Sequence, residues 1–336
     1  MNNSKSLKEF NTFGLDVISK NFNTARNEDQ IFKFLNNHSN DSLVILGGGS
    51  NILFKNDIER PILKIEIKGI NILKEDSNFV YVSVGAGENW NDFVNWSLEK
   101  NYGGIENLSL IPGNVGSAPI QNIGAYGVEL ETVFNSCRAI SIKSKELKIF
   151  KKEDCNFSYR SSIFKEELKN KYIISTVNFR LTKKNHPLKI DYKPLKELIE
   201  NKNILNPTIK NISDLVKEIR TSKLPDPQIV GNCGSFFKNP IVNKNKFDEI
   251  LNINKSIPFY KLSNKEFKIP AAWLIEKCGM KGVIDGQTGT HNKHALVIIN
   301  LGNATGLEIY TFSQKIKNLV LKKFNILLEE EVNVIE

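Results

Sequence analysis

The sequence predicts an α+β protein with more than one domain, and three observations lead to this fold class. The chain has 336 residues, which is more than a single small core requires. Its hydrophobic fraction of 40% and charged fraction of 25% are typical of a globular protein. Apolar runs typical of strands alternate along the chain with segments whose apolar residues follow the helical period.

Runs of apolar and β-branched residues predict strands in every part of the chain. These strands are expected at residues 43–46, 62–67, 79–84, 137–142, 147–150, 173–181, 295–300 and 326–335. Amphipathic spacing predicts helices between them, and Asn27 and Asn89 stand where N-cap residues are expected. The helices are expected at residues 28–35, 90–98, 213–220, 271–278 and 309–320, with one more earlier in the stretch 183–223.

A stiff joint is expected at Leu224–Pro227, because each of its two prolines disfavours a helix at the residue before it. We therefore place a domain boundary there.

The formal net charge of +9 would attract phosphates of any kind. The basic residues are spread along the chain without a block of five, and aromatic residues do not interleave with them in a stacking pattern. A solvated basic surface explains most of this charge, and a preference for small anionic molecules is the alternative. No nucleic-acid partner is expected.

The cysteines and the N-terminus indicate a cytoplasmic protein. Cys137, Cys155, Cys233 and Cys278 are irregularly spaced and form no C-x-x-C pair, so we expect reduced thiols rather than a zinc site or a disulfide framework. Residues 1–10 are polar and lack the apolar core of a signal peptide. No apolar run approaches the roughly 20 residues of a membrane helix, so no membrane contact is expected.

Two glycine-rich loops suggest a bound phosphate. Gly47–Asn51 directly follows a predicted buried strand, where α/β proteins often bind anions, although a tight turn alone would also explain it. Ile111–Gly127 has four glycines, two prolines and almost no charge, which suits a loop buried against a flat apolar ligand. Neither loop matches the dinucleotide fingerprint G-x-G-x-x-G, and the chain contains no P-loop and no G-x-S-x-G elbow.

Two polar side chains and one acidic run are candidates for chemistry. Ser235 follows a glycine and precedes two aromatics, so it is either a shielded proton donor or an ordinary turn serine. Arg160 could bind a carboxylate through two hydrogen bonds, or it could be a surface residue. The acidic run 329–331 would normally be solvated. His291 and His294 have the spacing of metal ligands, but no third ligand is evident, so no metal is expected.

Six motifs in this order closely resemble those of the UDP-N-acetylenolpyruvoylglucosamine reductase family, and the resemblance covers almost the whole chain. They are Asn11–Gly14, Gly47–Asn51, Ile111–Gly127, Tyr159–Phe164, Gly234–Pro240 and Leu328–Val332.

The resemblance implies three domains. Two would form the FAD-binding fold of the vanillyl-alcohol-oxidase type, at residues 1–75 and 76–225. The third, an α+β substrate-binding domain at residues 226–336, would send its last strand, about 326–336, back to the FAD domain. A loop near 186–200 would cover the substrate.

The implied reaction is the reduction of the enolpyruvyl ether of UDP-N-acetylglucosamine to UDP-N-acetylmuramate. FAD would be the cofactor, NADPH the co-substrate and the UDP-sugar the small-molecule partner, in a protein expected to be a monomer. NADPH would reduce the flavin, which would pass a hydride to the terminal vinyl carbon.

The resemblance also implies roles for single residues. Arg160 would stabilise the enolate, Ser235 would protonate it, and Glu331 would polarise groups around it. Glu331 is preferred to Glu330 because it directly precedes Val332. Tyr192, Lys223 and Asn239 resemble substrate-binding positions. The residues expected to bind FAD are Gly47, Gly48, Gly49, Ser50, Asn51, Gly113, Gly116, Ser117, Gln121, Asn122, Gly124, Ala125 and Tyr126.

Two alternatives remain at this point. One is another FAD-dependent sugar or alcohol oxidoreductase of the same fold. Many of those tether FAD through histidine, and because neither glycine loop contains one, we expect non-covalent FAD. The other is a basic nucleotide- or RNA-binding protein without catalysis, which would be colourless and bind in a salt-sensitive way.

Overall fold

The computed structural model describes residues 3–38 and 42–336, and the chain clusters into two compact units. The units are built from three segments each: unit 1 from Met1–Lys5, Ser19–Gly48 and Glu59–Ser222, and unit 2 from Ser6–Ile18, Gly49–Ile58 and Lys223–Glu336. The short strands β1 (Lys5–Ser6) and β2 (Ile18–Ser19) lie where the chain passes from one unit to the other. No helix in the described ranges is both long and apolar enough to cross a bilayer.

Unit 1 begins with a parallel sheet in the order β3 (Phe22–Ala25), β6 (Ile62–Ile65) and β4 (Val44–Leu46). Helix α1 (Glu28–Asn37) packs on it through Ile31 and Leu35. The helix begins at Asn27, as predicted, because the Asn27 side chain accepts a hydrogen bond from the Gln30 amide.

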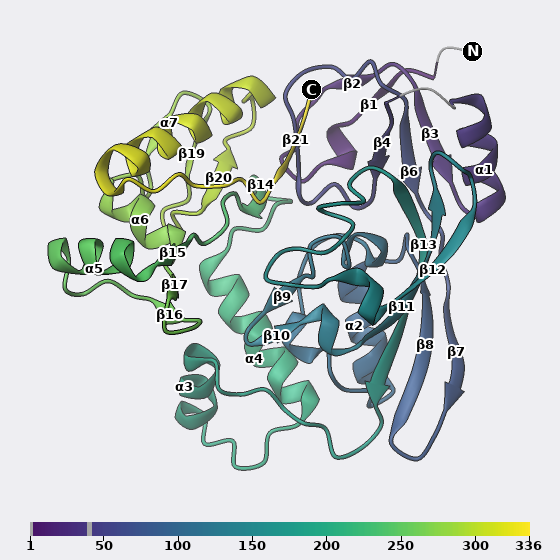
Figure 1. Ribbon diagram of the computed structural model, residues 1–336, viewed down its shortest axis with the longest axis horizontal. Coiled ribbons are helices and arrows are strands. Elements are labelled where there is room, and N and C mark those ends of the chain that lie inside the picture. The colour runs from purple at the N-terminus through teal and green to yellow at the C-terminus, as the bar shows by residue number, and fades with distance from the viewer. Residues whose placement is uncertain (1–2, 39–41) are drawn as a thin grey trace. The chain divides into compact units, whose positions relative to one another are not determined.

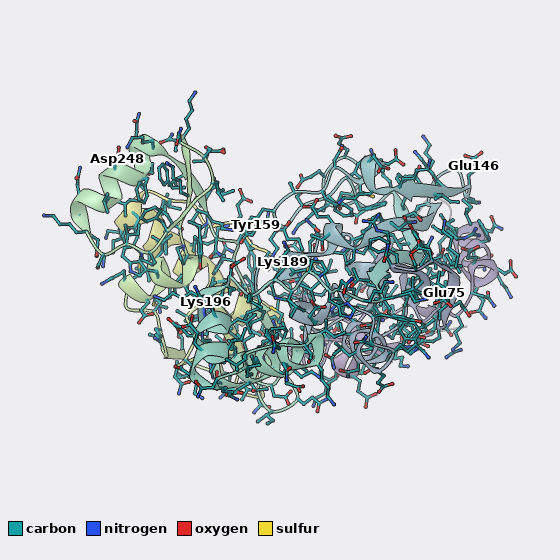
Figure 2. The ribbon with its side chains drawn as sticks, turned by 90° about the horizontal axis from the view of Figure 1, so that it is seen from below. Glu75, Glu146, Tyr159, Lys189, Lys196 and Asp248 are labelled. Carbon is teal, nitrogen blue, oxygen red and sulfur yellow. The ribbon has the colours of Figure 1, made fainter. Side chains whose placement is uncertain are left out.

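The larger sheet of unit 1 is antiparallel and has five strands (Figure 1). Its strands lie in the order β12 (Leu147–Lys151), β11 (Phe134–Ser141), β13 (Tyr172–Thr182), β8 (Phe79–Gly85) and β7 (Ile70–Glu75). Helix α2 (Trp90–Glu99) buries Trp90 and Phe93 against Phe179 of the sheet, which makes an aromatic core. Figure 2 shows Glu75 and Glu146 on the surface of this unit, where both side chains are exposed.

The rest of unit 1 consists of short elements and two helices. The predicted loop 111–127 contains β9 (Gly124–Ala125), which pairs with β10 (Val128–Glu129). Helices α3 (Lys193–Asn201) and α4 (Ile209–Lys223) pack through Leu195, Ile212 and their neighbours. Two helices were predicted in this stretch, but a loop was expected over 186–200, and its second half is helix α3.

Unit 2 contains a four-stranded sheet in the order β14 (Gly231–Ser235), β20 (Val297–Asn300), β19 (Thr288–Thr290) and β18 (Ile284–Asp285). Helix α7 (Gly306–Phe324) contacts β19 and β20 and also α6 (Ala271–Lys277). A capping box between Thr305 and Glu308 begins α7.

A smaller antiparallel sheet, β15 (Ile241–Asn243), β17 (Glu266–Lys268) and β16 (Tyr260–Lys261), carries helix α5 (Lys244–Ile253). Phe247 of the helix stacks on Phe267 of the sheet with 4.2 Å between the ring centroids. Short 3₁₀ helices lie at Lys8–Phe10, Glu106–Leu108, Val115–Ser117, Leu130–Thr132 and Lys152–Cys155.

The prediction of a strand over 326–335 is wrong for most of its length. Only β21 (Asn333–Ile335) is a strand, and it pairs in parallel with β5 (Ile52–Phe54). Ile326 and Leu328 are buried without regular structure, so an apolar alternation here reflects packing rather than a sheet. β5 directly follows the first glycine loop, and both β5 and β21 belong to unit 2.

Candidate functional site

The first half of the Gly47–Asn51 loop lies against the second glycine loop in unit 1. A Cβ added at Gly48 would be 2.8 Å from Asn114 Oδ1 and 2.8 Å from Gly113 Cα. A Cβ at Gly47 would be 3.8 Å from Ser117, which is ordinary contact. The two loops that the sequence singled out are therefore neighbours, and their close approach requires glycine at Gly48.

The second loop is held in turn by the Gly85–Gly87 turn. The amides of Val115 and Gly116 donate to the carbonyls of Glu88 and Ala86, both at 2.9 Å. A Cβ at Gly116 would be 2.4 Å from Ala86 Cβ, so this approach also depends on glycine. Three glycine turns thus form one uncharged cradle, in which peptide groups can come close to a phosphate.

A cation that the sequence analysis missed lies beside this cradle. Lys64, on β6, donates from Nζ to the carbonyl of Gly47 at 3.1 Å. Burial is the main cause that lowers the pKa of Lys64, and the neighbouring Glu66 opposes this effect. Lys64 sits within a strand of apolar residues, so only the register of β6 with β4 shows that it reaches the loop.

The second half of the Gly47–Asn51 loop belongs to unit 2 and is anchored there. Gly49 has φ +66°, and a Cβ would meet the Phe10 carbonyl oxygen at 1.9 Å. Asn51 Nδ2 donates to the Glu331 carbonyl at 3.0 Å, and the Asn51 carbonyl accepts from the Asn333 amide. The side-chain NH₂ of Asn51, a residue predicted to bind FAD, thus holds the C-terminal segment.

Other predicted cofactor residues also support the loop itself. Asn122 is fully buried at φ +45°, and its amide bonds Glu129 Oε2, the Ser158 carbonyl and the Glu131 amide. The Ser117 hydroxyl donates to the Asn114 carbonyl at 2.7 Å. These two side chains shape the loop, so a contact with FAD would come from their peptide groups. Gln121, Gly124 and Ala125 lie in the same loop, with Gln121 Oε1 3.4 Å from Lys165 Nζ.

Arg160 lies at the tip of a tight turn in unit 1. Paired backbone hydrogen bonds between Ser158 and Ser161 close the turn, and Arg160 itself has φ +53°. One guanidinium nitrogen donates to the Gly124 carbonyl at 2.7 Å. A non-glycine residue in the left-handed region is costly, so the turn holds Arg160 in a defined position against the glycine loop.

A second arginine, Arg220 on α4, lies close to Arg160 and was not found from the sequence. Its guanidinium forms a hydrogen bond with the Tyr126 hydroxyl. Desolvation, and to a smaller extent the positive charge of Arg160, lower the pKa of Arg220. Burial raises the pKa of Tyr126, so its hydroxyl stays protonated. Tyr192, the N-cap residue of α3, packs edge-on against Tyr126 with 5.2 Å between centroids. Unit 1 thus brings together two guanidinium groups and two phenol rings, those of Arg160, Arg220, Tyr126 and Tyr192. This arrangement suits an anionic ligand.

Ser235 ends β14 in unit 2. The pairing of β14 with β20 shifts register between Asn232 and Ser235, which marks an irregularity of the β-bulge type, and Gly234 within it has φ +75°. Such irregularities re-aim side chains at the end of a strand. Ser235 remains half-buried, with Phe236 and Phe237 buried behind it.

The acidic run 329–331 lies next to Ser235. The Glu331 amide donates to the Phe236 carbonyl at 2.9 Å, and the Lys238 amide donates to the Glu329 carbonyl. Glu330 Oε1 accepts from Lys317 at 2.8 Å and from Gln314 at 3.0 Å, contacts that lower its pKa against the effect of burial. Glu330 therefore forms an ion pair with Lys317 within unit 2.

Cys233 lies near this carboxylate. Burial, and then the charge of Glu331, raise the pKa of the Cys233 thiol well above its usual range. The thiol is therefore neutral and unreactive, and Cys137, Cys155, Cys233 and Cys278 are all free.

A cluster of cations lies elsewhere in unit 2. Lys223 and Lys281 are near His294, and their charges, together with burial as the larger cause, lower the pKa of that imidazole. The predicted substrate residue Lys223 thus has neighbours that the sequence analysis missed. Asn239 Oδ1, also predicted to bind substrate, accepts from the Ala271 amide at the start of α6 at 2.8 Å.

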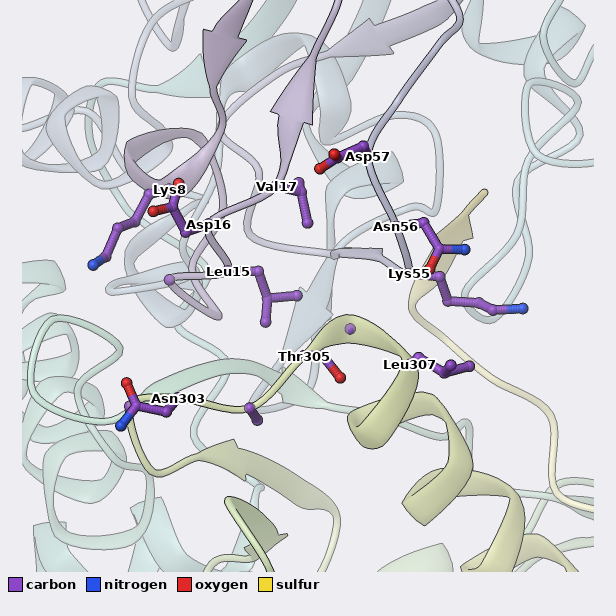
Figure 3. Close-up of a pocket in the computed structure, with 14 residues that line it drawn as sticks. Lys8, Leu15, Asp16, Val17, Lys55, Asn56, Asp57, Asn303, Thr305 and Leu307 are labelled. Atoms are coloured by element: carbon purple, nitrogen blue, oxygen red, sulfur yellow. The ribbon is translucent and has the colours of Figure 1, made fainter.

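A separate pocket of about 540 Å³ lies in unit 2 at the start of α7 (Figure 3). Figure 3 shows it between the segment that carries Leu15 and Val17 and the turn that carries Thr305. None of the predicted site residues lines it. Its polar groups are used within the protein, as in the Ile18 amide that donates to Asp57 at 2.7 Å and the Thr305 hydroxyl in its capping box.

Comparison with known proteins matches both parts of the chain. Residues 22–143 match the family model of an FAD binding domain, and residues 226–335 match that of the UDP-N-acetylenolpyruvoylglucosamine reductase C-terminal domain. The protein therefore binds FAD, and the cradle formed by the glycine turns lies largely within the first match.

Curated relatives cover nearly the whole chain. The UDP-N-acetylenolpyruvoylglucosamine reductase of Flavobacterium johnsoniae is 47% identical, covering 98% of each chain. The Pseudomonas aeruginosa enzyme of that name is 40% identical, covering 98% of this chain and 97% of its own. A crystal structure of the Thermus caldophilus reductase has a TM-score of 0.68 at 20% identity, covering 100% and 99% of the two chains. The predicted fold class, an FAD-binding fold followed by an α+β domain, is confirmed.

Proposed function

This chain belongs to the UDP-N-acetylenolpyruvoylglucosamine reductase family, and on that premise we propose that it reduces UDP-N-acetylglucosamine enolpyruvate to UDP-N-acetylmuramate. The electrons come from NADPH, and the reaction supplies a peptidoglycan precursor in the cytoplasm. The observation that carries this proposal is the near-complete length over which the chain matches reductases of that name. The protein acts as a monomer and requires neither metal nor nucleic acid.

The glycine cradle fits the FAD pyrophosphate because it offers peptide groups at close range and no acidic side chain. The predicted FAD contacts from Gly47 to Gly49 and from Gly113 to Tyr126 follow from this fit, mainly through backbone atoms. Bound FAD supplies hydride transfer between NADPH and the terminal vinyl carbon of the substrate.

Arg160 stabilises the negative charge that develops on the substrate carboxylate and its neighbouring carbon. Its backbone turn and its bond to Gly124 hold the guanidinium in place before the reaction, which is how preorganised electrostatic catalysis acts. Arg220 adds a second positive charge, and Tyr126 positions it through their hydrogen bond.

Ser235 donates the proton to the carbon next to the carboxylate. A hydroxyl is a weak acid, but the enolate it protonates is strongly basic, so the transfer is feasible. Glu331 orients groups around the enolate, and the hydrogen bonds of its backbone with the Phe236 carbonyl and the Asn51 side chain fix its place beside Ser235.

The UDP part of the substrate needs cations for its diphosphate. Lys223 and Lys281 supply them in unit 2, and Asn239 at the start of α6 adds an amide. Tyr192 contacts the substrate from its position beside Tyr126.

The test follows NADPH absorbance with the FAD-loaded enzyme, with and without the enolpyruvyl UDP-sugar. Substrate-dependent oxidation is expected, and its absence rejects the proposal.

Ser235→Ala then separates the two half-reactions. Flavin reduction by NADPH should stay near the wild-type rate, while reoxidation by substrate slows by about 10²–10⁴-fold, the usual contribution of general acid catalysis. Ser256→Ala, at an exposed turn of the same unit, is the control. Equal loss in both half-reactions would remove Ser235 from the role of proton donor.

The proposal also includes non-covalent FAD, because neither glycine loop contains a histidine. Acid precipitation should leave the flavin in the supernatant. Yellow colour that stays with the precipitated protein would instead favour an oxidase of the same fold with tethered FAD.

A further inference from the structure

Two histidines occupy the short connection between β19 and β20 in unit 2. The His291 amide donates to the Val297 carbonyl at 2.8 Å, and the Val297 amide donates to the His294 carbonyl at 3.0 Å. The connection is therefore a closed loop with fixed backbone, and both histidine side chains are at least partly buried in it.

A second segment, Met280–Val283, is bonded to the same loop and brings Lys281 to it. The Thr290 amide donates to the Val283 carbonyl at 2.9 Å, and the Thr290 hydroxyl donates to the Met280 carbonyl. Lys281 is thereby fixed near His294, as is Lys223 from the end of α4.

The charges that face His294 are almost all positive. They come from Lys223, from Lys281 and from His291 on its own loop. Lys281 also pairs with the Glu276 carboxylate at 3.1 Å. Lys293 faces His291.

The ring nitrogens show which form of His294 the free protein holds. The Nδ1 atoms of His291 and His294 are buried without a hydrogen-bond partner among the described residues. A protonated ring would carry an N–H there without an acceptor, in addition to facing the cations Lys223 and Lys281, so the free protein keeps His294 neutral. Burial and these cations lower its pKa accordingly.

We propose that His294 takes up a proton when the diphosphate of the UDP-sugar binds beside Lys223 and Lys281, so that substrate affinity in this enzyme rises as the pH falls. This inference rests on the proposed function, because the UDP-sugar brings the diphosphate. The bound phosphate supplies the negative countercharge that the free loop lacks.

The sign of the effect follows from linkage. Binding of the anion favours the charged imidazole, so its pKa is higher in the complex than in the free protein. At pH values above both pKa values no proton is gained and affinity is lowest. As the pH falls through the pKa of His294 in the complex, affinity rises by at most about tenfold per pH unit for one proton. Affinity levels off below the pKa of His294 in the free protein.

The test measures UDP binding to the FAD-loaded enzyme by calorimetry at pH 6–8, in pairs of buffers with different ionisation enthalpies. The buffer pairs count the protons taken up with UDP. Wild type should take up a fraction of one proton more than His294→Gln, whose amide keeps hydrogen bonding but cannot be charged. The Kd of the wild type for UDP should also rise between pH 6 and pH 8 by a factor at least about three times larger than that of His294→Gln.

The comparison between proteins removes the titration of UDP itself, which is common to both. His38→Gln, in the other unit, should behave as wild type. Equal proton uptake by wild type and His294→Gln would overturn the proposal, and so would the absence of UDP binding. If proton uptake is seen but the enolpyruvyl sugar is not reduced, the proposed function fails while the proton coupling stands.

Discussion

Gly48→Ala tests whether the two glycine loops form one cofactor cradle. The new Cβ would stand 2.8 Å from Gly113 Cα and from Asn114 Oδ1, whereas ordinary contact needs roughly 3.5–4.0 Å between carbon atoms. One loop must therefore retreat by about 1 Å, and overpacking of this kind costs about 1–3 kcal/mol. If the retreat spoils the cradle, this cost reduces FAD affinity by roughly 5- to 150-fold.

Gly47→Ala is the matched control, because its Cβ would make only ordinary contact with Ser117 at 3.8 Å. Both substitutions reduce the conformational entropy of the unfolded chain, which stabilises both variants by the same amount, about 0.4–1 kcal/mol. The difference in stability between the two variants therefore isolates the clash. The assays are flavin fluorescence titration of the apoprotein and its urea unfolding. Gly48→Ala should lose both stability and FAD affinity, while Gly47→Ala keeps its stability. Wild-type behaviour of Gly48→Ala in both assays would refute the contact between the loops.

Two further predictions concern named side chains of unit 1. Tyr126→Phe leaves the Arg220 guanidinium without its phenol partner. The kcat/KM for the enolpyruvyl sugar should therefore fall by about 5- to 150-fold, equivalent to about 1–3 kcal/mol, while flavin reduction by NADPH stays unchanged. A stopped-flow comparison that finds both steps unchanged contradicts the pairing. The Arg138 hydrogen bond lowers the pKa of Glu28, so its stabilisation is present above about pH 4.5 and is lost as the pH falls through the lowered value. In acid unfolding, Glu28→Gln should lose less free energy of unfolding than wild type as the pH falls. The difference should be about 1 kcal/mol or less, because the Glu28–Arg138 pair is partly exposed. Parallel curves of stability against pH for the two proteins would disprove a contribution of this pair.

Most elements of the fold could be predicted because their signals are local. Asn27 and Asn89 cap α1 and α2 as expected, and β13 matches its apolar run closely. β7 was missed because it is exposed over almost its whole length, whereas α5 has apolar residues at helical spacing that the sequence analysis did not recognise. The segment 326–335 was misassigned because burial by neighbouring elements, rather than strand pairing, determines its apolar pattern.

The candidate site residues divide in the same way. The glycine loops could be found from composition, because close backbone approach restricts the choice of residue. Arg160 and Ser235 needed the family resemblance, since one arginine or serine in a turn has no local signal. Arg220, Lys64 and Lys281 were missed altogether, because each depends on a contact with a residue far along the sequence.

The net charge of +9 shows why position matters more than the total. Many lysines form exposed ion pairs, such as Lys20 with Glu59 and Lys315 with Asp285, and these contribute little. Arg220 differs, because its interactions are with Tyr126 and with another cation, Arg160. A partly buried guanidinium held beside a like charge is unfavourable in the free protein. A bound anion would remove that penalty, so the charge arrangement of unit 1 favours the binding of an anionic ligand there.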